Sequence, residues 1–366
     1  MKVAVLFTER LRDYDFGEGH PYRGDRYEGF FKLYREKLGG HPDFVLREPE
    51  PASEEDLLLV HTRDYVDFVK AASLGLSPPS RYLLFRYQSA DNISPLTGTL
   101  PKGIEQAARI IVGISKAAGE LVWRREFDFA IGIGGGLHHA KPSYGEGFCI
   151  YNDVAVCARN LLERHGARRI LILDTDAHAG NGTCEIFYED PRVLFIDLHQ
   201  DPRTLYPGTG FAHEIGRGEG EGFTVNIPMP PGASDKAYEY VLDEIFLPLA
   251  EQFRPEIIIR NGGCDPHFAD GLTYLGMTLE GFKMIGRKVR EAARICGCGT
   301  VDLITSGYNP KVLPRGWLAL ISGLTGVEIE LEDLPRPGWL SPERGLEETR
   351  KVVEEVKRHL RPFWNV

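Results

Sequence analysis

The apolar run Arg169-Ile170-Leu171-Ile172-Leu173 leads directly into Asp174-Thr175-Asp176-Ala177-His178. A short run of leucine and isoleucine is typical of a strand buried in a parallel sheet. Its carboxyl end carries two carboxylates and an imidazole at alternate positions, and alternate side chains of an extended strand project from the same side. Because ligands of open α/β sheets bind beyond the carboxyl ends of the strands, this stretch predicts a divalent-metal site that does chemistry.

Further strand-like and helical segments alternate along the chain. The strand-like segments are Val3–Phe7, Phe127–Gly134, Arg169–Asp174, Val193–His199, Glu256–Asn261 and Val301–Ser306, and the helical ones are Lys102–Trp123, Asn152–His165, Ser234–Gln252 and Thr278–Ala293. This alternation predicts an α/β fold with a central, largely parallel β-sheet flanked by helices on both faces. Because no repeat or linker interrupts it, we expect a single domain over residues 1–366.

Two helix starts carry local signals. Ser53-Glu54-Glu55-Asp56 resembles a capping signal ahead of an apolar run. Ser341-Pro342 resembles an N-cap followed by a proline in the first turn. It predicts the start of a final docking helix, whose apolar stripe is Leu346, Val353, Val356 and Leu360.

The composition is that of an acidic globular protein. The chain has 366 residues, 42% of them hydrophobic, and a formal net charge of −10. Phosphate binding needs basic surface, so this charge argues against direct nucleic-acid binding, and it is compatible with cationic substrates such as lysine side chains or polyamines. No apolar run reaches the roughly 20 residues of a membrane helix, and Met1–Phe7 is too short for a signal peptide. We therefore expect a cytoplasmic protein without a membrane partner.

Chemically active residues also follow three other predicted strands. His138 and His139 follow the glycine-rich end of Phe127–Gly134, Asp265 follows Glu256–Asn261, and Tyr308 follows Val301–Ser306. Taken singly, each has an ordinary structural explanation: a surface histidine pair, a turn residue before proline, a packed tyrosine. Four such features at four strand ends favour one common site.

The donor set of this site indicates its chemistry. Two carboxylates and one imidazole suit zinc or a similar divalent ion, and three protein ligands leave room for water and a carbonyl oxygen. A nearby imidazole could accept a proton from water and one could later protonate a leaving amine. A phenol hydroxyl could stabilise the developing oxyanion. The set predicts metal-assisted hydrolysis of an amide or a related acyl bond.

These residues together resemble the zinc-dependent histone deacetylase superfamily, in particular its prokaryotic members similar to acetoin utilization protein. The resemblance covers most of the chain, and although each fragment is weak alone, the combination is specific. The matching stretches are Gly17–Pro21, Leu59–Tyr65, Gly135–His139, Gly147–Cys149, Asn152-Asp153, Asp174–His178, Tyr206–Gly210, Asp265 and Gly307-Tyr308.

The resemblance implies an arginase–deacetylase fold and one zinc ion per chain. Its implied zinc ligands are Asp176, His178 and Asp265. It also implies that His138 and His139 form an acid–base pair, that Asp174 orients His138, that Asn181 contacts His139, and that Tyr308 hydrogen-bonds the acetyl carbonyl oxygen.

The resemblance further implies a narrow tunnel for an aliphatic side chain. Phe148 and Tyr206 would wall it together with Leu272, and Asp91 is the best match, after a one-residue shift, for the acidic residue that grips the substrate. The family also often binds potassium close to the Asp174 strand. Asp197 stands where members often place a small polar residue, which leaves a K⁺ site open.

Three positions depart from the family pattern. Ala179 replaces the second histidine of the usual His-His-Gly motif, Asn181 stands where many members carry Asp, and Ser306 interrupts the glycines before Tyr308. A neutral partner at 181 would make His139 a weaker base than a carboxylate would.

Three functions follow from these patterns. The first is a zinc-dependent deacetylase for acetyl-lysine or a related acetylated amine, such as an acetylpolyamine or a small acyl metabolite. The second is an arginase-like ureohydrolase with two manganese ions, which is disfavoured because Leu137 and Asn181 stand where further ligands are expected. The third is a non-catalytic metal-binding module that recognises acylated partners, which Tyr308 argues against. The sequence leaves the oligomeric state open.

Overall fold

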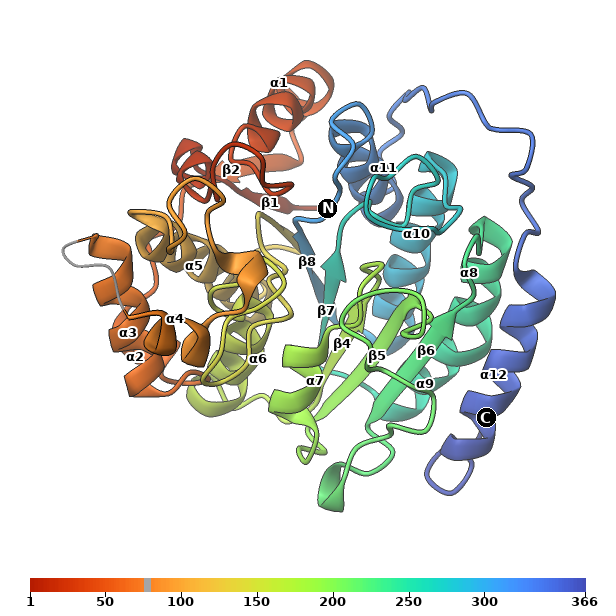
Figure 1. Cartoon of the computed structure of the whole chain (residues 1–366). Coiled ribbons are helices and arrows are strands. Elements are labelled where there is room, and N and C mark those ends of the chain that lie inside the picture. The colour runs from red at the N-terminus through yellow and green to blue at the C-terminus, as the bar shows by residue number, and fades with distance from the viewer. Residues whose placement is uncertain (76–79) are drawn as a thin grey trace.

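The computed structural model describes residues 1–75 and 80–366, and an eight-stranded sheet forms its centre (Figure 1). The strands are β1 (Val3–Leu6), β2 (Phe44–Arg47), β3 (Phe129–Ile133), β4 (Ile170–Asp174), β5 (Val193–Gln200), β6 (Thr224–Met229), β7 (Ile257–Gly262) and β8 (Gly299–Ile304). Their order is β2-β1-β3-β8-β7-β4-β5-β6, and every pairing is parallel. The prediction of a largely parallel sheet is confirmed.

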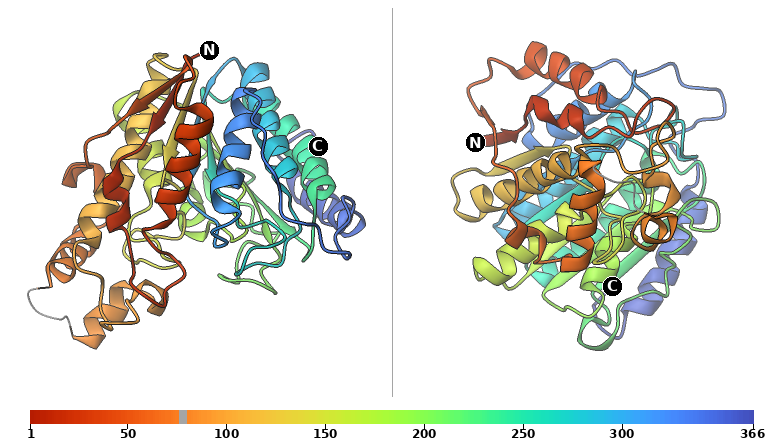
Figure 2. Two further views of the ribbon diagram at one scale, coloured as in Figure 1. Left: turned by 90° about the horizontal axis from the view of Figure 1, so that it is seen from above. Right: turned by 60° about the vertical axis from the view of Figure 1, so that its left-hand side comes forward.

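Twelve α-helices accompany the sheet in the described residues. They are α1 (Arg26–Leu38), α2 (Glu54–Leu57), α3 (Arg63–Leu74), α4 (Arg81–Tyr87), α5 (Ile104–Trp123), α6 (Asp153–Arg164), α7 (Asn181–Phe187), α8 (Asp235–Val241), α9 (Leu247–Phe253), α10 (Leu279–Cys296), α11 (Leu313–Thr325) and α12 (Leu346–Leu360). Helices α5 and α6 pack together on one face, and α10 and α11 pack together on the other (Figures 1 and 2). In residues 1–75 and 80–366 no helix combines the length and apolarity needed to cross a membrane.

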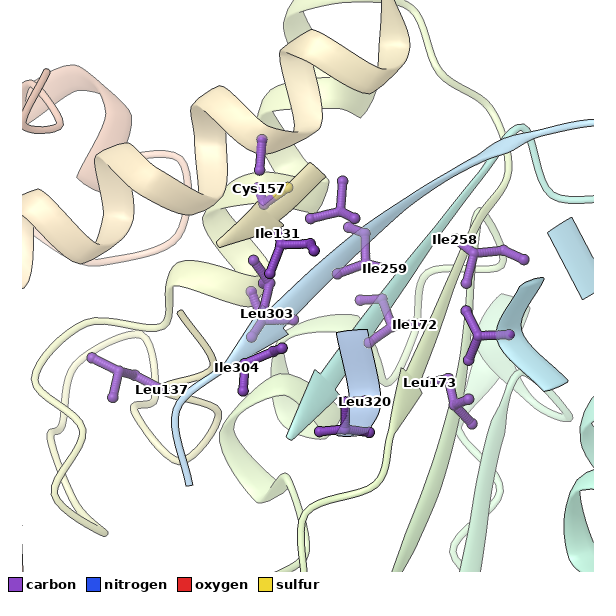
Figure 3. Packing of buried hydrophobic residues seen from close by; sticks show 14 of the residues in the cluster. Ile131, Leu137, Cys157, Ile172, Leu173, Ile258, Ile259, Leu303, Ile304 and Leu320 are labelled. Carbon is purple, nitrogen blue, oxygen red and sulfur yellow. The ribbon is translucent and has the colours of Figure 1, made fainter. Parts of the chain in front are cut away.

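The central strands are buried on both faces, which explains their continuous apolar character. All residues of β3, β4 and β7 are buried. Ile131, Ile172, Ile259 and Leu303 come from four different strands and lie in one hydrophobic cluster with side chains of the covering helices (Figure 3). This packing holds the ends of the central strands at one level.

The two strands that the sequence analysis did not predict are the edges of the sheet. β2 is half-buried or exposed along its length, so it lacks the continuous apolar run of a central strand. β6 contains Pro228, a residue that edge strands tolerate and central strands do not. Edge strands therefore gave weaker sequence signals than the six strands that were predicted.

The helix predictions were confirmed in part. Ser53 forms the expected capping box with Asp56 at the start of α2. The predicted helix Ser234–Gln252 consists of α8, a π-helical turn (Leu242–Phe246) and α9. The predicted helix start at Ser341-Pro342 is wrong, because α12 begins at Leu346. Gly345 precedes this helix with a left-handed φ of 76°, a conformation that a continuous helix through residues 342–346 would not allow. Pro342 instead accepts a backbone hydrogen bond from Lys236.

The topology brings four of the predicted strand ends together. β7 and β8 lie between β3 and β4, so β3-β8-β7-β4 are neighbours at the centre of the sheet. In register, Ile304 pairs with both Ile133 and Gly262, and Asp174 pairs with Asn261. The loops that leave these strands therefore start from the same edge.

Candidate active site

The three predicted metal ligands converge from two loops. Asp176 and His178 follow β4, and Asp265 follows β7. Nδ1 of His178 lies 3.1 Å from Oδ1 of Asp176 and 3.0 Å from Oδ2 of Asp265. The three ligand atoms lie within 4.8 Å of one another, and no second cluster of this kind occurs within residues 1–75 and 80–366. The described residues thus offer one set of donor atoms that could hold a metal ion.

The charges of this cluster favour a cation. Burial, and then the neighbouring Asp176 carboxylate, raise the pKa of Asp265 to about 7. Burial alone would lower the pKa of His178, but Asp176 and Asp265 raise it to about 10. The two carboxylates thus attract positive charge to Nδ1, the atom that faces them both. Because carboxylate oxygen and imidazole nitrogen are donors that zinc accepts, these side chains fit a divalent ion.

The two adjacent histidines lie beside this cluster. His138 and His139 are buried in the loop after β3, and their Nε2 atoms lie 3.1 Å apart. Burial would lower the pKa of His138, but Asp174 and Asp176 raise it to about 9. Burial and the charges on His138 and His178 hold the pKa of His139 well below its usual range. The two rings therefore have opposite charge preferences, a pattern found in acid–base pairs.

Asp174 holds the first of these rings. Its Oδ2 accepts hydrogen bonds from Nδ1 of His138 and from Nδ2 of Asn261, each 2.7 Å long. A Cβ at Gly180 would lie 2.6 Å from the same oxygen, so only glycine leaves room there. Because Nδ1 of His138 donates to a carboxylate, the orientation of the ring is fixed and its Nε2 points toward Nε2 of His139.

Asn181 holds the second ring. It is the first residue of α7, and its Oδ1 accepts a 2.8 Å hydrogen bond from Nδ1 of His139. Its Nδ2 donates at 2.7 Å to Oε1 of Glu146. The sequence analysis missed Glu146, because a single acidic residue in a long loop carries no strand-end or motif signal.

A pocket of about 240 Å³ opens beside the histidines and the metal-ligand cluster. Its lining residues are Asp91, His139, Gly147, Phe148, His178, Leu205, Tyr206, Leu272 and Tyr308. All four predicted substrate-binding residues are among them. Phe148 has a left-handed φ of 65°, and its carbonyl oxygen accepts a 2.6 Å hydrogen bond from the hydroxyl of Tyr14. A left-handed φ is unfavourable for phenylalanine, and the hydrogen bond from Tyr14 helps to hold the Phe148 backbone in this conformation.

Tyr308 faces this pocket from the loop after β8. Its backbone N–H donates a 2.7 Å hydrogen bond to Asp270, and the guanidinium carbon of Arg26 lies 5.1 Å from its ring centroid. Arg26 also donates to the carbonyl oxygens of Thr305 and Gly307, at 2.9 Å each. Burial raises the pKa of Tyr308 well above its usual range. The phenol therefore keeps its proton at neutral pH and can donate it to an oxygen.

Asp91 lies at the pocket as the sequence analysis expected, in the short 3₁₀ turn Ala90–Asn92. Its Oδ2 accepts a 2.9 Å hydrogen bond from the backbone of Gly147, and its carbonyl oxygen bonds Nε2 of His20 at 2.8 Å. These contacts tie the loop that carries Asp91 to the loop that carries Phe148.

Several supporting residues were not predicted. Asn261 bonds Asp174, and Oγ of Ser306 donates a 2.7 Å hydrogen bond to Oδ1 of Asp265. Ser306 thus makes a hydrogen bond to a predicted ligand that a glycine at this position could not make. Both residues lie at strand ends, where their positions in the sequence could have suggested a role.

The other departures also have structural explanations. Ala179 is buried, and a Cβ at Gly210 would lie 3.0 Å from its Cβ, so a small residue at 179 allows the Gly210 loop to approach. Asp197 accepts a 2.9 Å hydrogen bond from Gly180 and lies 2.9 Å from Nδ1 of His199. Oδ1 of Asp197 and Nδ1 of His199 are nevertheless buried without a hydrogen-bond partner in the described residues, and the potassium site stays a prediction.

The alternative of a two-manganese centre finds no support in the described residues. Leu137 is an apolar, buried side chain at the position before His138, and Asn181 is engaged by His139 and Glu146. Neither offers the additional carboxylate that a bridged pair of metal ions requires.

Comparisons with known proteins agree with this geometry. Residues 20–324 match the histone deacetylase domain family. The chain is 36% identical to a probable deacetylase of Archaeoglobus fulgidus, covering 100% of this chain and 99% of that protein. It is 32% identical to the acetoin utilization protein AcuC of Bacillus subtilis, covering 92% of this chain and 85% of that protein.

A solved structure supports the same assignment. The HD domain of HDA15 superposes with a TM-score of 0.82 at 27% identity, covering 99% of this chain and 96% of that chain. The parallel sheet and its flanking helices therefore form the arginase–deacetylase fold, as predicted. On the family match and the level of identity, this chain belongs to the histone deacetylase family.

Proposed function

We propose that this chain is a zinc-dependent deacetylase that hydrolyses the acetyl amide of acetyl-lysine or a related acetylated amine, with one deacetylase domain over residues 1–366. The observation that carries the proposal is the convergence of Asp176, His178 and Asp265 beside two histidines and a tyrosine at one narrow pocket. Membership of the histone deacetylase family supports hydrolysis of an amide.

Asp176, His178 and Asp265 would hold the zinc ion. When bound, zinc supplies Lewis-acid chemistry that acidifies water and polarises a carbonyl group. The remaining side chains supply proton transfer, orientation and the walls of the pocket.

The hydrogen bonds support different roles for the two histidines. Since Oδ1 of Asn181 can only accept, Nδ1 of His139 carries a proton and Nε2 keeps its lone pair. His139 is therefore the general base that takes a proton from the attacking water. Its Nε2 lies 3.1 Å from that of His138, whose other ring nitrogen, Nδ1, donates a hydrogen bond to the Asp174 carboxylate. The pair can then return a proton to the leaving amine.

Tyr308 and the pocket walls complete the scheme. The Tyr308 hydroxyl donates a hydrogen bond to the acetyl carbonyl oxygen as negative charge develops there. Phe148, Tyr206 and Leu272 enclose an aliphatic chain, and Asp91 lies where it can accept a hydrogen bond from the substrate.

A turnover screen on the purified protein tests the proposal. The substrates are acetyl-lysine peptides and acetylpolyamines, with bound zinc measured on the same samples. We expect acetate release with about one zinc per chain. A protein that holds zinc but releases no acetate from any of these substrates would contradict the proposal, and two manganese per chain with urea release would favour the ureohydrolase instead.

A further inference from the structure

The amide of Asn181 bridges the proposed base and a carboxylate. Oδ1 accepts from Nδ1 of His139 at 2.8 Å, and Nδ2 donates to Oε1 of Glu146 at 2.7 Å. Glu146 lies 35 positions before Asn181, in the loop between β3 and α6. One amide thus connects the active-site ring to a side chain that does not line the pocket beside it.

The two ends of an amide have nearly the same shape but opposite hydrogen-bonding character. An asparagine can therefore turn either end toward a histidine, and its other partner decides which. An ionised carboxylate only accepts, so Glu146 selects the NH₂ end of Asn181. The carbonyl end then faces His139, whose Nδ1 must donate.

The surroundings of Glu146 hold it in this role. Nζ of Lys141 lies 3.3 Å from the same Oε1, and only 14% of the Glu146 side chain is exposed. The next residue, Gly147, passes so close to His139 that a Cβ there would lie 2.2 Å from the ring. The Glu146 carboxylate is thus held near His139, and the Lys141 ammonium balances its charge.

We propose that Glu146 is a positioning residue, which fixes the amide orientation of Asn181 and through it the tautomer of His139. The proposal rests on the proposed function for the role of His139. It also explains the neutral residue at 181: an aspartate there would place two carboxylates within hydrogen-bonding distance, and their repulsion would displace the partner of His139.

A double-mutant cycle with Glu146→Gln and Asn181→Asp tests this. Glu146→Gln keeps an acceptor and should lower kcat only a few-fold. Asn181→Asp alone should lower kcat by about 10- to 100-fold, the range found when a residue that orients an active-site side chain is replaced. In the double variant the glutamine NH₂ can donate to Asp, so kcat should exceed that of Asn181→Asp alone. KM and bound zinc should stay unchanged throughout.

Two further variants separate positioning from general structure. Glu146→Met removes the acceptor and should lower kcat about tenfold or more with an unchanged thermal midpoint. Glu185→Gln is the matched control, because Glu185 lies 3.6 Å from Lys141 on the exposed side of α7, and it should keep full activity. Additive effects in the cycle, or full activity of Glu146→Met, would overturn the proposal.

The ¹⁵N resonances of selectively labelled His139 report the tautomer without any turnover. We expect a single Nδ1–H form in the parent protein and a mixture in Glu146→Met. An identical tautomer in both would refute the role of Glu146. A parent protein without deacetylase activity would instead refute the proposed function, so the two failures are distinguishable.

Discussion

Oδ2 of Asp265 lies 3.0 Å from Nδ1 of His178, although 87 positions separate the two residues in the chain. Asp265 lies in the loop after β7 and His178 lies in the loop after β4, and these two strands are direct neighbours in the sheet. The contact therefore depends on the strand order. Together with Asp176, Asp265 places two buried carboxylates around the one imidazole of His178.

Asp176→Ala should lose metal and activity together. Removal of one of three protein ligands leaves two donors, which bind zinc far more weakly than a complete set. Bound zinc by mass spectrometry and turnover should both fall to near background. Tyr308→Phe is the control that should retain zinc, since its ring lies outside the ligand cluster. Full zinc occupancy in Asp176→Ala would remove this residue from the metal site.

His139→Ala should abolish activity while retaining the metal. General-base catalysis contributes about 10²- to 10⁴-fold, and the ligand cluster does not include His139. The measurements are kcat and zinc content on one preparation. An active His139→Ala protein would mean that another group takes the proton.

Tyr308→Phe distinguishes an enzyme from a binding module. If the hydroxyl stabilises the oxyanion, its removal should lower kcat by about 10²- to 10³-fold and leave KM nearly unchanged. Steady-state kinetics on an acetyl-lysine peptide measures both constants. Equal residual turnover in the parent and the variant would favour a module that binds acylated partners without turning them over.

His61 should make the fold sensitive to acid. Its Nδ1 donates to the carbonyl oxygen of Lys141 at 3.1 Å, and its Nε2 accepts from the backbone N–H of Asn152 at 3.0 Å. Burial lowers the pKa of His61 to about 4, whereas an unfolded histidine titrates near pH ~6.5.

The folded chain therefore takes up this proton only at lower pH than the unfolded chain does. The stabilisation is complete above about pH 6.5 and is lost as the pH falls toward 4, by up to about 3 kcal/mol. Urea unfolding between these pH values measures the loss. His61→Asn should be less stable at neutral pH and show a weaker dependence on pH, and an equal dependence in both proteins would contradict the assignment.

Asp153 should stabilise the loop that carries His138 and His139. Its carboxylate accepts hydrogen bonds from the backbone of Gly136 at 2.9 Å and Leu137 at 2.7 Å, and from the hydroxyl of Ser115 at 2.5 Å. Asp153→Ala leaves these buried donors without a partner and should lower the free energy of unfolding by about 3 kcal/mol. Ser115→Ala removes one donor and should cost about 1 kcal/mol. Equal losses in urea unfolding would contradict this account.

The positions of the predicted metal ligands and of the histidine pair could be read from the sequence because a strand end is a local pattern. An apolar run that stops at Asp174 indicates both a buried strand and the place where its polar residues emerge. Asn261 and Ser306 occupy comparable positions but were overlooked, since asparagine and serine near glycines are ordinary turn residues. The edge strands β2 and β6 were missed because exposure and proline weaken the apolar signal on which strand prediction depends.

The sequence by itself determined the parallel α/β fold and the strand ends at which the candidate site residues lie, because burial sets apolar periodicity and each strand end is encoded within a few neighbouring positions. Only the tertiary structure decided which of these residues touch. Insertion of β7 and β8 between β3 and β4 brings Asp265 to His178, and loop packing brings Glu146 to Asn181. Such contacts depend on long-range strand order and on the direction of side chains, and no local run of residues encodes either.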